Sequence, residues 1–174
     1  ITINNINTSP VISTLIPDQQ VLEGAAFAAI DLDNFVEDLD ELAASLTWGT
    51  SGQVGLTATI DPATHAATVT TPNADWFGSE TITFTVTDSG GLSNSQAAVF
   101  TVTAVNDAPT VTLISPAGGE LWHGVQTLSW NASDVDGTVT VDLSYQSGGA
   151  GWQMIAAGLV ASGTYDWDTQ SVAD

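Results

Sequence analysis

The sequence predicts an all-β protein made of two tandem β-sandwiches joined by a short, stiff linker. Three observations support this fold class. Several segments alternate between Thr or Ser and apolar residues, as strands with one buried face do. Gly, Pro, Asn and Asp interrupt these segments about every 8–12 residues, the spacing of turns in a sandwich. A strand and the linker after it occur twice in the chain, one domain length apart.

Period-2 alternation is clearest in residues 81–87, 98–103 and 138–145, which we predict as strands. Thr, Val, Ile and Phe are frequent there, and these types favour a pleated, half-buried surface. No segment carries a convincing helical stripe, and we expect at most one helical turn in residues 35–46. Turns are expected at Asp61-Pro62, Ser89-Gly90-Gly91, Asp136-Gly137 and Ser147-Gly148-Gly149.

The repeat sets the expected domain organisation. Ile1, Ile3, Asn7 and Pro10 fall on Phe100, Val102, Asn106 and Pro109, an offset of 99 residues. Residues 1–8 are therefore expected to be the last strand and linker of a preceding repeat, or a donor strand. Residues 9–107 then form a first sandwich and residues 108–174 a second one. Pro109 stiffens the short linker, so we expect the two sandwiches to be held nearly in line.

Charge narrows the range of partners. The chain has no Lys or Arg and 20 Asp and Glu residues, which gives a net charge of −20. Such a chain cannot neutralise phosphates, so nucleic acid is excluded as a partner and anionic membranes are disfavoured. No apolar run approaches the 18 or so residues of a membrane span. Carboxylates are ligands for divalent cations, although a high-salt habitat is a competing explanation for the acidity.

Cysteine is absent, which excludes disulfides, thiolate nucleophiles and zinc–sulfur sites together. His65 and His123 are the only histidines, and we expect both on the surface without a specific role. Neither lies in a recognisable catalytic motif, and we do not expect an enzyme. Trp76 and Trp122 are candidates for stacking on sugar rings, whereas Trp130 and Trp167 are expected in the core.

Four passages of the first domain belong together. They are Val21-Leu22-Glu23-Gly24, residues 35–42, Phe77-Gly78 with the strand up to Gly91, and residues 105–109. These passages resemble the cadherin-like tandem repeats of microbial surface proteins, occur in the order of that family and cover the whole domain. The resemblance implies a cadherin-like sandwich outside the cell, with Ca²⁺ at the domain junctions.

In the second domain, residues 115–120, 128–134, 151–152 and 164–169 are similar to motifs of an Ig-like module of secreted microbial proteins. In such modules one more strand follows the segment Trp167-Asp168-Thr169, so we expect this domain to lack its final strand. Three explanations are open: the boundary of the sequence falls before that strand, the strand is present but disordered, or a strand from another copy supplies it.

The cadherin-like resemblance also implies two sets of calcium ligands, one at the junction between the two domains (the lower junction) and one at the junction before the first domain (the upper junction). The lower junction would draw on Glu23, Asn106, Asp107, Asp134 and Asp136, with Asp75 or Glu80 as a further candidate, and the upper junction on Asn7, Asp38, Asp40 and Asp88. Asp is also common in turns because its side chain caps backbone N–H groups, and this explanation competes for each single Asp.

The sequence as a whole predicts a non-enzymatic, extracellular structural or adhesive segment of a cell-surface protein or fibre. Its expected partners are neighbouring repeats of the same protein or copies of itself, and Ca²⁺ is expected to stiffen the junction. One alternative is a carbohydrate-binding accessory region of a large secreted enzyme, with an extracellular polysaccharide as its partner. Another is the subunit of a filament that exchanges strands between copies.

Overall fold

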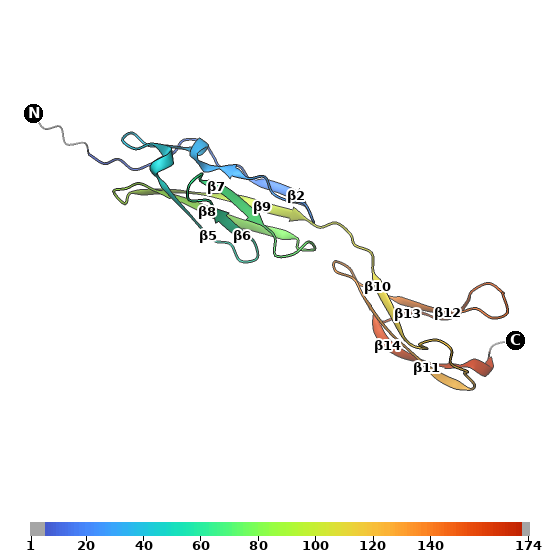
Figure 1. Cartoon of the computed structure of the whole chain (residues 1–174). Coiled ribbons are helices and arrows are strands. Elements are labelled where there is room, and N and C mark those ends of the chain that lie inside the picture. Colours follow the sequence, from blue (N-terminus) through green and yellow to red (C-terminus); the bar gives the residue numbers. More distant parts are fainter. Residues whose placement is uncertain (1–5, 172–174) are drawn as a thin grey trace, which may run out of the picture. The chain divides into compact units, whose positions relative to one another are not determined.

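The computed structural model describes residues 6–171. Internal contacts divide the chain into two compact units, Ile1–Val105 (unit 1) and Asn106–Asp174 (unit 2). In the described residues both units consist of β-strands, with helix limited to single 3-10 turns (Figure 1). The predicted all-β fold class is confirmed. Within residues 6–171, no helix has the length and apolar character of a membrane span.

Unit 1 is built from two main sheets. One has the strand order β2-β9-β8-β5, the other has the order β3-β7-β6, and β1 and β4 form a short separate pair. All pairs are antiparallel except β2 and β9, which run parallel. The elements are β1 (Val11–Ile12), β2 (Gln19–Leu22), β3 (Ile30–Asp31), η1 (Leu32–Phe35), β4 (Val36–Glu37), η2 (Ala43–Ser45), β5 (Thr47–Ser51), β6 (Thr57–Ile60), β7 (Ala66–Thr70), β8 (Gly78–Thr87) and β9 (Ser93–Thr103).

The core of unit 1 follows from the alternation in its longest strands. In β8, Ile82, Phe84 and Val86 are fully buried, and the Thr residues between them point away from the core. Phe84 and Phe100 pack with Ile30 and other residues of the second sheet in one cluster. Fully burying such a side chain contributes about 1.5–3 kcal/mol. The predicted strand 81–87 therefore lies within β8, and 98–103 lies within β9.

Unit 2 has a three-stranded sheet, β10-β11-β14, and a two-stranded sheet, β12-β13. Its core cluster combines Trp130 of β11 with Leu143 of β12. The strand predicted at 138–145 is shorter in the structure, where β12 begins at Val141 and residues 138–140 belong to no strand. The elements are β10 (Thr110–Ser115), β11 (Val125–Ser133), β12 (Val141–Tyr145), β13 (Gln153–Leu159), β14 (Ser162–Asp168) and η3 (Thr169–Ser171).

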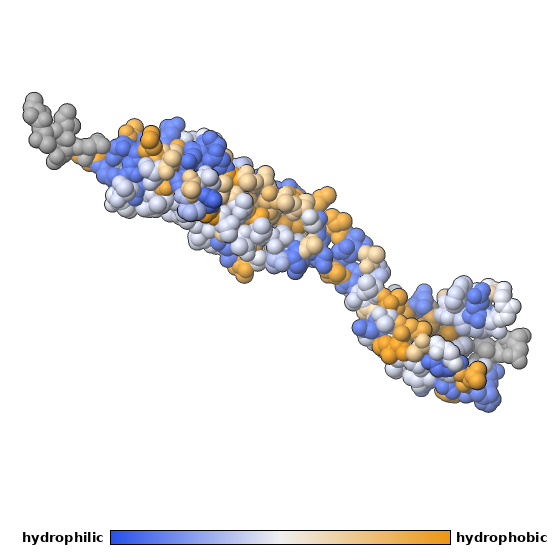
Figure 2. Space-filling view, viewed as in Figure 1, coloured by the Kyte–Doolittle hydropathy of each residue, from blue (hydrophilic) through white to orange (hydrophobic). Residues whose placement is uncertain are grey.

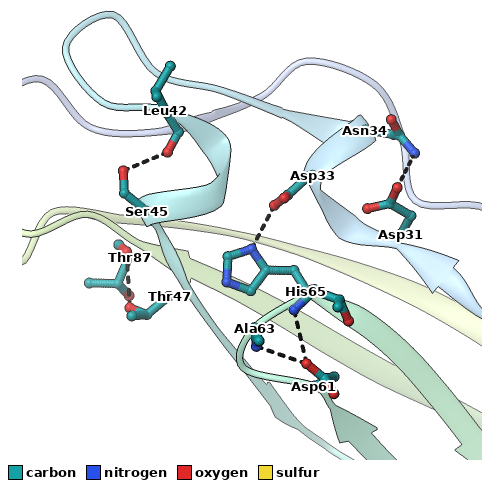
Figure 3. A network of polar contacts seen from close by, with 11 residues as sticks. Asp31, Asp33, Asn34, Leu42, Ser45, Thr47, Asp61, Ala63, His65 and Thr87 are labelled. Atoms are coloured by element: carbon teal, nitrogen blue, oxygen red, sulfur yellow. Dashed lines mark hydrogen bonds and ion pairs between the residues drawn. The ribbon is translucent and has the colours of Figure 1, made fainter.

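His65 is buried, contrary to the surface position that we expected for it. Its side chain and backbone together are 5% exposed, and ring Nδ1 lies 2.7 Å from Asp33 Oδ1 (Figure 3). Its backbone N–H donates to the carbonyl of Asp61 at 2.9 Å. The side chain therefore ties the turn between β6 and β7 to η1, and the second histidine, His123, remains exposed.

Candidate metal centre

Glu23 lies directly after β2, where its backbone N–H continues the pairing with β9 by donating to the carbonyl of Thr103 at 2.9 Å. Its side chain turns to the end of unit 1, and Oε2 accepts a hydrogen bond from the Val105 N–H at 2.9 Å. The other oxygen, Oε1, is buried and has no hydrogen-bond partner among the described residues. A buried carboxylate oxygen without a donor is unfavourable, so this atom is suited to a cation.

Asp75 brings a second carboxylate to the same end of unit 1. It lies in the loop before β8, and its backbone N–H donates to Asn73 Oδ1 at 3.0 Å. One of its carboxylate oxygens lies within 4.8 Å of an oxygen of Glu23. Since the chain has no Lys or Arg, no ammonium or guanidinium group can compensate these charges. In the sequence analysis Asp75 was a further candidate for the lower junction, beside the main set of predicted ligands.

In unit 2 the predicted ligands gather around its first residues. The backbone N–H of Asp107 donates to Asp136 Oδ1 at 3.4 Å, and the Asn106 amide donates to the carbonyl of Asp107 at 2.7 Å. A hydrogen bond with the Asp134 carboxyl, together with partial burial, raises the pKa of Asp136 above its usual value. The raised pKa shows that the carboxyl groups of Asp134 and Asp136 are held close together although two negative charges repel each other.

Asp88 and Asp40 belong to the predicted upper set and lie in unit 1. Asp88 is 6% exposed and accepts hydrogen bonds from Asn7 Nδ2 at 2.9 Å and from the Leu92 N–H at 2.8 Å. Asp40 Oδ1 accepts from the hydroxyl of Thr8 and from its N–H, the latter at 3.1 Å. These two bonds lower the pKa of Asp40. Both carboxylates thus fasten residues 7–8 to the rest of unit 1.

Asp38 completes this upper set. Its Oδ1 caps the following turn by accepting from the N–H groups of Asp40 and Glu41 at 2.9 and 3.1 Å, and its Oδ2 is buried without a partner in the described residues. In the described part of the chain, the carboxylates of Asp38, Asp40 and Asp88 do not form a group in which all three lie within 4.8 Å of one another. They act chiefly as backbone caps, and calcium binding at this end stays a prediction.

Glu80 has a structural role that the sequence did not indicate. Its two carboxylate oxygens accept hydrogen bonds from three consecutive N–H groups, those of Val54 (2.8 Å), Gly55 (2.6 Å) and Leu56 (3.2 Å). Partial burial raises the pKa of Glu80, but the three bonds together lower it by more, so the pKa lies below its usual value. The side chain closes the loop before β6 onto β8, and metal binding by Glu80 stays a prediction.

Replacing Glu80 with glutamine is expected to destabilise unit 1 by about 1–3 kcal/mol at neutral pH, because an amide cannot accept all three bonds. The folded-state pKa is depressed, so the carboxylate stabilises the fold above its unfolded-state pKa. This contribution is lost as the pH falls through the folded-state pKa. Urea unfolding at pH 7 and at successively lower pH should show the two proteins converging in acid. A difference that does not change with pH would contradict this role.

Trp76 and Trp122 are both partly buried and pack against the cores of units 1 and 2 respectively. The ring of Trp76 lies over glycines, since a Cβ built at Gly78 would be 3.3 Å from it. The exposed tryptophan is Trp152, with 73% of its surface accessible, which the sequence did not single out. Sugar binding by Trp76 and Trp122 stays a prediction.

Three comparisons with known proteins bear on this geometry. A family model described as "Bacterial Ig domain" matches residues 7–103. Among solved structures, the extracellular cadherin domains 3–6 of protocadherin gamma B2 are 15% identical, with a TM-score of 0.45, over 88% of this chain and 39% of that one. The fibronectin(III)-like modules of Clostridium thermocellum CbhA are 14% identical, with a TM-score of 0.34, over 92% of this chain and 78% of theirs. No curated protein matches.

The family match falls on unit 1, for which the motifs had pointed to a cadherin-like repeat, and does not extend into unit 2. Ig and cadherin domains share the sandwich architecture, so a short set of strand and turn motifs does not separate them well. The chain spans 39% of the protocadherin chain that it matches. The family match itself covers more than half of this sequence. The chain belongs to the bacterial Ig domain family.

Proposed function

We propose that the chain is a non-enzymatic structural or adhesive segment of a cell-surface protein or fibre, and that Ca²⁺ bound at the end of unit 1 stiffens it. Bacterial Ig domains are typically extracellular modules without catalytic activity. Tandem sandwich modules with short connections suit this role, because each unit has a hydrophobic core of its own. Calcium binding is the part of the proposal that substitutions in this chain can test directly.

The observation that carries the proposal is the carboxylate of Glu23. Oε2 is fixed by the Val105 N–H, while Oε1 is buried without a hydrogen-bond donor in the described residues, and one oxygen of this carboxylate lies within 4.8 Å of a carboxylate oxygen of Asp75. An oxygen-only donor set of this kind matches the preference of Ca²⁺ for carboxylates and carbonyls. Glu23 and Asp75 would hold the ion, and the ion would neutralise the negative charges of both carboxylates.

The linker offers further ligands through chain continuity. Only Asn106 separates Val105 from Asp107, and two residues of extended chain span at most about 7 Å. A carboxylate and an amide therefore follow directly on the residue that Glu23 anchors. If Asn106 and Asp107 also bind the ion, the connection between the units loses backbone freedom. This restriction of the backbone is what we mean by stiffening.

Calcium is expected to raise the melting temperature of unit 1. Extracellular calcium modules bind with dissociation constants of about 0.1–1 mM, so about 10 mM Ca²⁺ adds roughly 1.4–2.7 kcal/mol to the free energy of unfolding. For a domain of this size the midpoint then rises by roughly 6–20 °C. Differential scanning calorimetry with calcium and with a chelator measures the shift. Glu23→Gln should remove most of it.

A matched control for that variant is Glu37→Gln, which removes the same charge from an exposed position on β4. It should leave the calcium shift intact. NaCl at the same ionic strength separates binding from general screening of a chain with a net charge of −20. An equal rise with NaCl, or no difference between the two variants, would contradict the calcium site and favour the high-salt explanation of the acidity.

A further inference from the structure

A groove in unit 2 lies between β13 and β14. These strands follow each other in the chain but belong to different sheets, and each is the end strand of its sheet among the described residues. Residues 153–155, residues 165–168 and Tyr145 at the end of β12 line the groove, which has a volume of about 450 Å³. Figure 2 shows hydrophobic and hydrophilic residues side by side on the visible face of unit 2. A groove of this volume and mixed lining suits a small ligand.

Three aromatic rings contribute to the lining of this groove, those of Tyr145, Tyr165 and Trp167. The rings of Tyr145 and Trp167 adjoin, with their centroids 5.2 Å apart and their planes inclined by 41°. Tyr165 and Trp167 are partly buried and pack against the core of unit 2, which fixes their positions. The face of an aromatic ring carries partial negative charge, so a fixed aromatic surface attracts a cation.

Two carboxylates lie beside these rings, because Asp166 and Asp168 belong to the same lining and are exposed. Asp166 Oδ1 accepts a hydrogen bond from the hydroxyl of Thr127 at 2.7 Å, which holds this carboxylate against β11. Asp168 Oδ1 accepts one from the Gln170 N–H at 3.0 Å. With no Lys or Arg in the chain, no ammonium or guanidinium group of its own can occupy the groove. The negative charge there is therefore open to a cation from outside.

The charges of the groove discriminate between classes of ligand. An anion would meet two carboxylates in a chain with a net charge of −20 and would be repelled. A neutral sugar would stack on the rings and hydrogen-bond to the amide of Gln153, but it would gain nothing from the charge. An organic cation gains from the rings and from the carboxylates together. The combination of rings and charge thus favours the cation.

We infer that the groove between β13 and β14 binds a small organic cation of the quaternary ammonium type, held by the rings of Tyr145 and Trp167 and the carboxylate of Asp166. Alkyl groups around the nitrogen pack on aromatic rings, and the positive charge interacts with the ring faces. The net charge of the chain raises the local concentration of such an ion. This binding activity goes beyond the proposed structural role and does not depend on calcium.

Choline is the probe for this site, because its neutral tert-butyl analogue has nearly the same shape without the charge. NMR titration of the full chain, with a chelator present and at physiological ionic strength, follows the ring signals of Tyr145 and Trp167. Choline should shift these signals in a saturable way, with a dissociation constant of millimolar order, since so small a ligand makes few contacts. The neutral analogue should produce no saturable shift.

Four variants separate the contributions of charge and rings. Asp166→Asn retains an acceptor for Thr127 but loses the charge, and should weaken choline binding about two- to five-fold. Asp142→Asn, the matched control, removes the same charge from β12 at a position outside the groove lining, and should bind normally. Tyr145→Leu should weaken binding about two- to five-fold, whereas Tyr145→Phe keeps the ring and should bind as the unaltered chain does.

Folding of each variant is checked in the same NMR spectra, and Asp166→Asn tests the site even if Tyr145→Leu fails to fold. Phosphatidylcholine vesicles carry the same ammonium group on a lipid, next to a phosphate that the acidic groove repels. The chain should therefore not sediment with these vesicles. Sedimentation with them would assign the groove to a lipid headgroup and overturn its assignment to a free cation.

Three further results would contradict the proposed cation site. Choline could give no saturable shift, which would show that the groove does not bind this class of ion. Choline and its neutral analogue could bind equally well, which would leave an apolar groove without charge recognition. Glucose could shift the same signals more strongly than choline and lose this effect in Tyr145→Phe, which would assign the groove to sugars recognised through their hydroxyl groups.

Discussion

Replacing Phe100 with alanine is expected to lower the free energy of unfolding of unit 1 by about 3–5 kcal/mol. Phe100 is fully buried in β9, with its ring centroid 5.2 Å from that of Phe27 in an edge-to-face contact and 6.3 Å from that of Phe84. The truncation removes apolar contacts and leaves a cavity between the two sheets. Chemical denaturation followed by circular dichroism measures the loss.

The neighbouring residue in the same strand provides the control for Phe100→Ala. Val99 points to the opposite face of β9 and is only partly buried, so Val99→Ala should lose much less stability. The two units have separate cores, and the transition of unit 2 should stay where it is in both variants. A loss below about 1 kcal/mol for Phe100→Ala would mean that the sheets collapse onto the cavity or that this core is not formed.

Trp130→Ala should have the largest effect on unit 2, with a loss of about 3–5 kcal/mol. Trp130 is 3% exposed, lies in the core cluster, and donates its indole N–H to the carbonyl of Val160 at 3.0 Å. The core of this unit is small, and small cores rarely contribute more than a few kcal/mol of net stability. We therefore expect unit 2 of this variant to be unfolded while unit 1 remains folded.

NMR spectra of the full chain resolve that outcome, because the signals of unit 2 should collapse to the random-coil range while those of unit 1 persist. Trp130→Phe separates packing from hydrogen bonding, since it retains most of the apolar volume but leaves the Val160 carbonyl without its partner. Its expected loss is smaller, at about 1–3 kcal/mol. Equal effects of alanine and phenylalanine would show that the hydrogen bond dominates, contrary to this account.

The long strands could be predicted from the sequence because their burial obeys the period of two. The pattern around Ile82, Phe84 and Val86 is visible in the residue types themselves and reappears as full burial in β8. The strands β1, β3 and β4 have two residues each, and no period can be recognised over two residues. Their positions follow from tertiary packing.

The candidate metal centre was predictable in its residue types and only partly in its geometry. The motif around Glu23 and the acidic linker indicated the region, but the buried, unpartnered oxygen of Glu23 depends on the path of the chain at Val105. The contact between His65 and Asp33 joins residues 32 positions apart, and nothing local in the sequence connects them. The role of Glu80 was likewise missed, because its partners are backbone groups of a remote loop.

The parallel pairing of β2 with β9 has a mechanical consequence. β2 lies near the start of unit 1 and β9 at its end, and the four residue pairs from Gln19–Phe100 to Leu22–Thr103 join them side by side. A force that pulls the two ends of the unit apart acts along both strands in opposite directions. It loads their hydrogen bonds in shear, so that the bonds resist together, whereas a hairpin pulled at its open end separates one pair at a time. This arrangement suits a module that transmits tension along a chain.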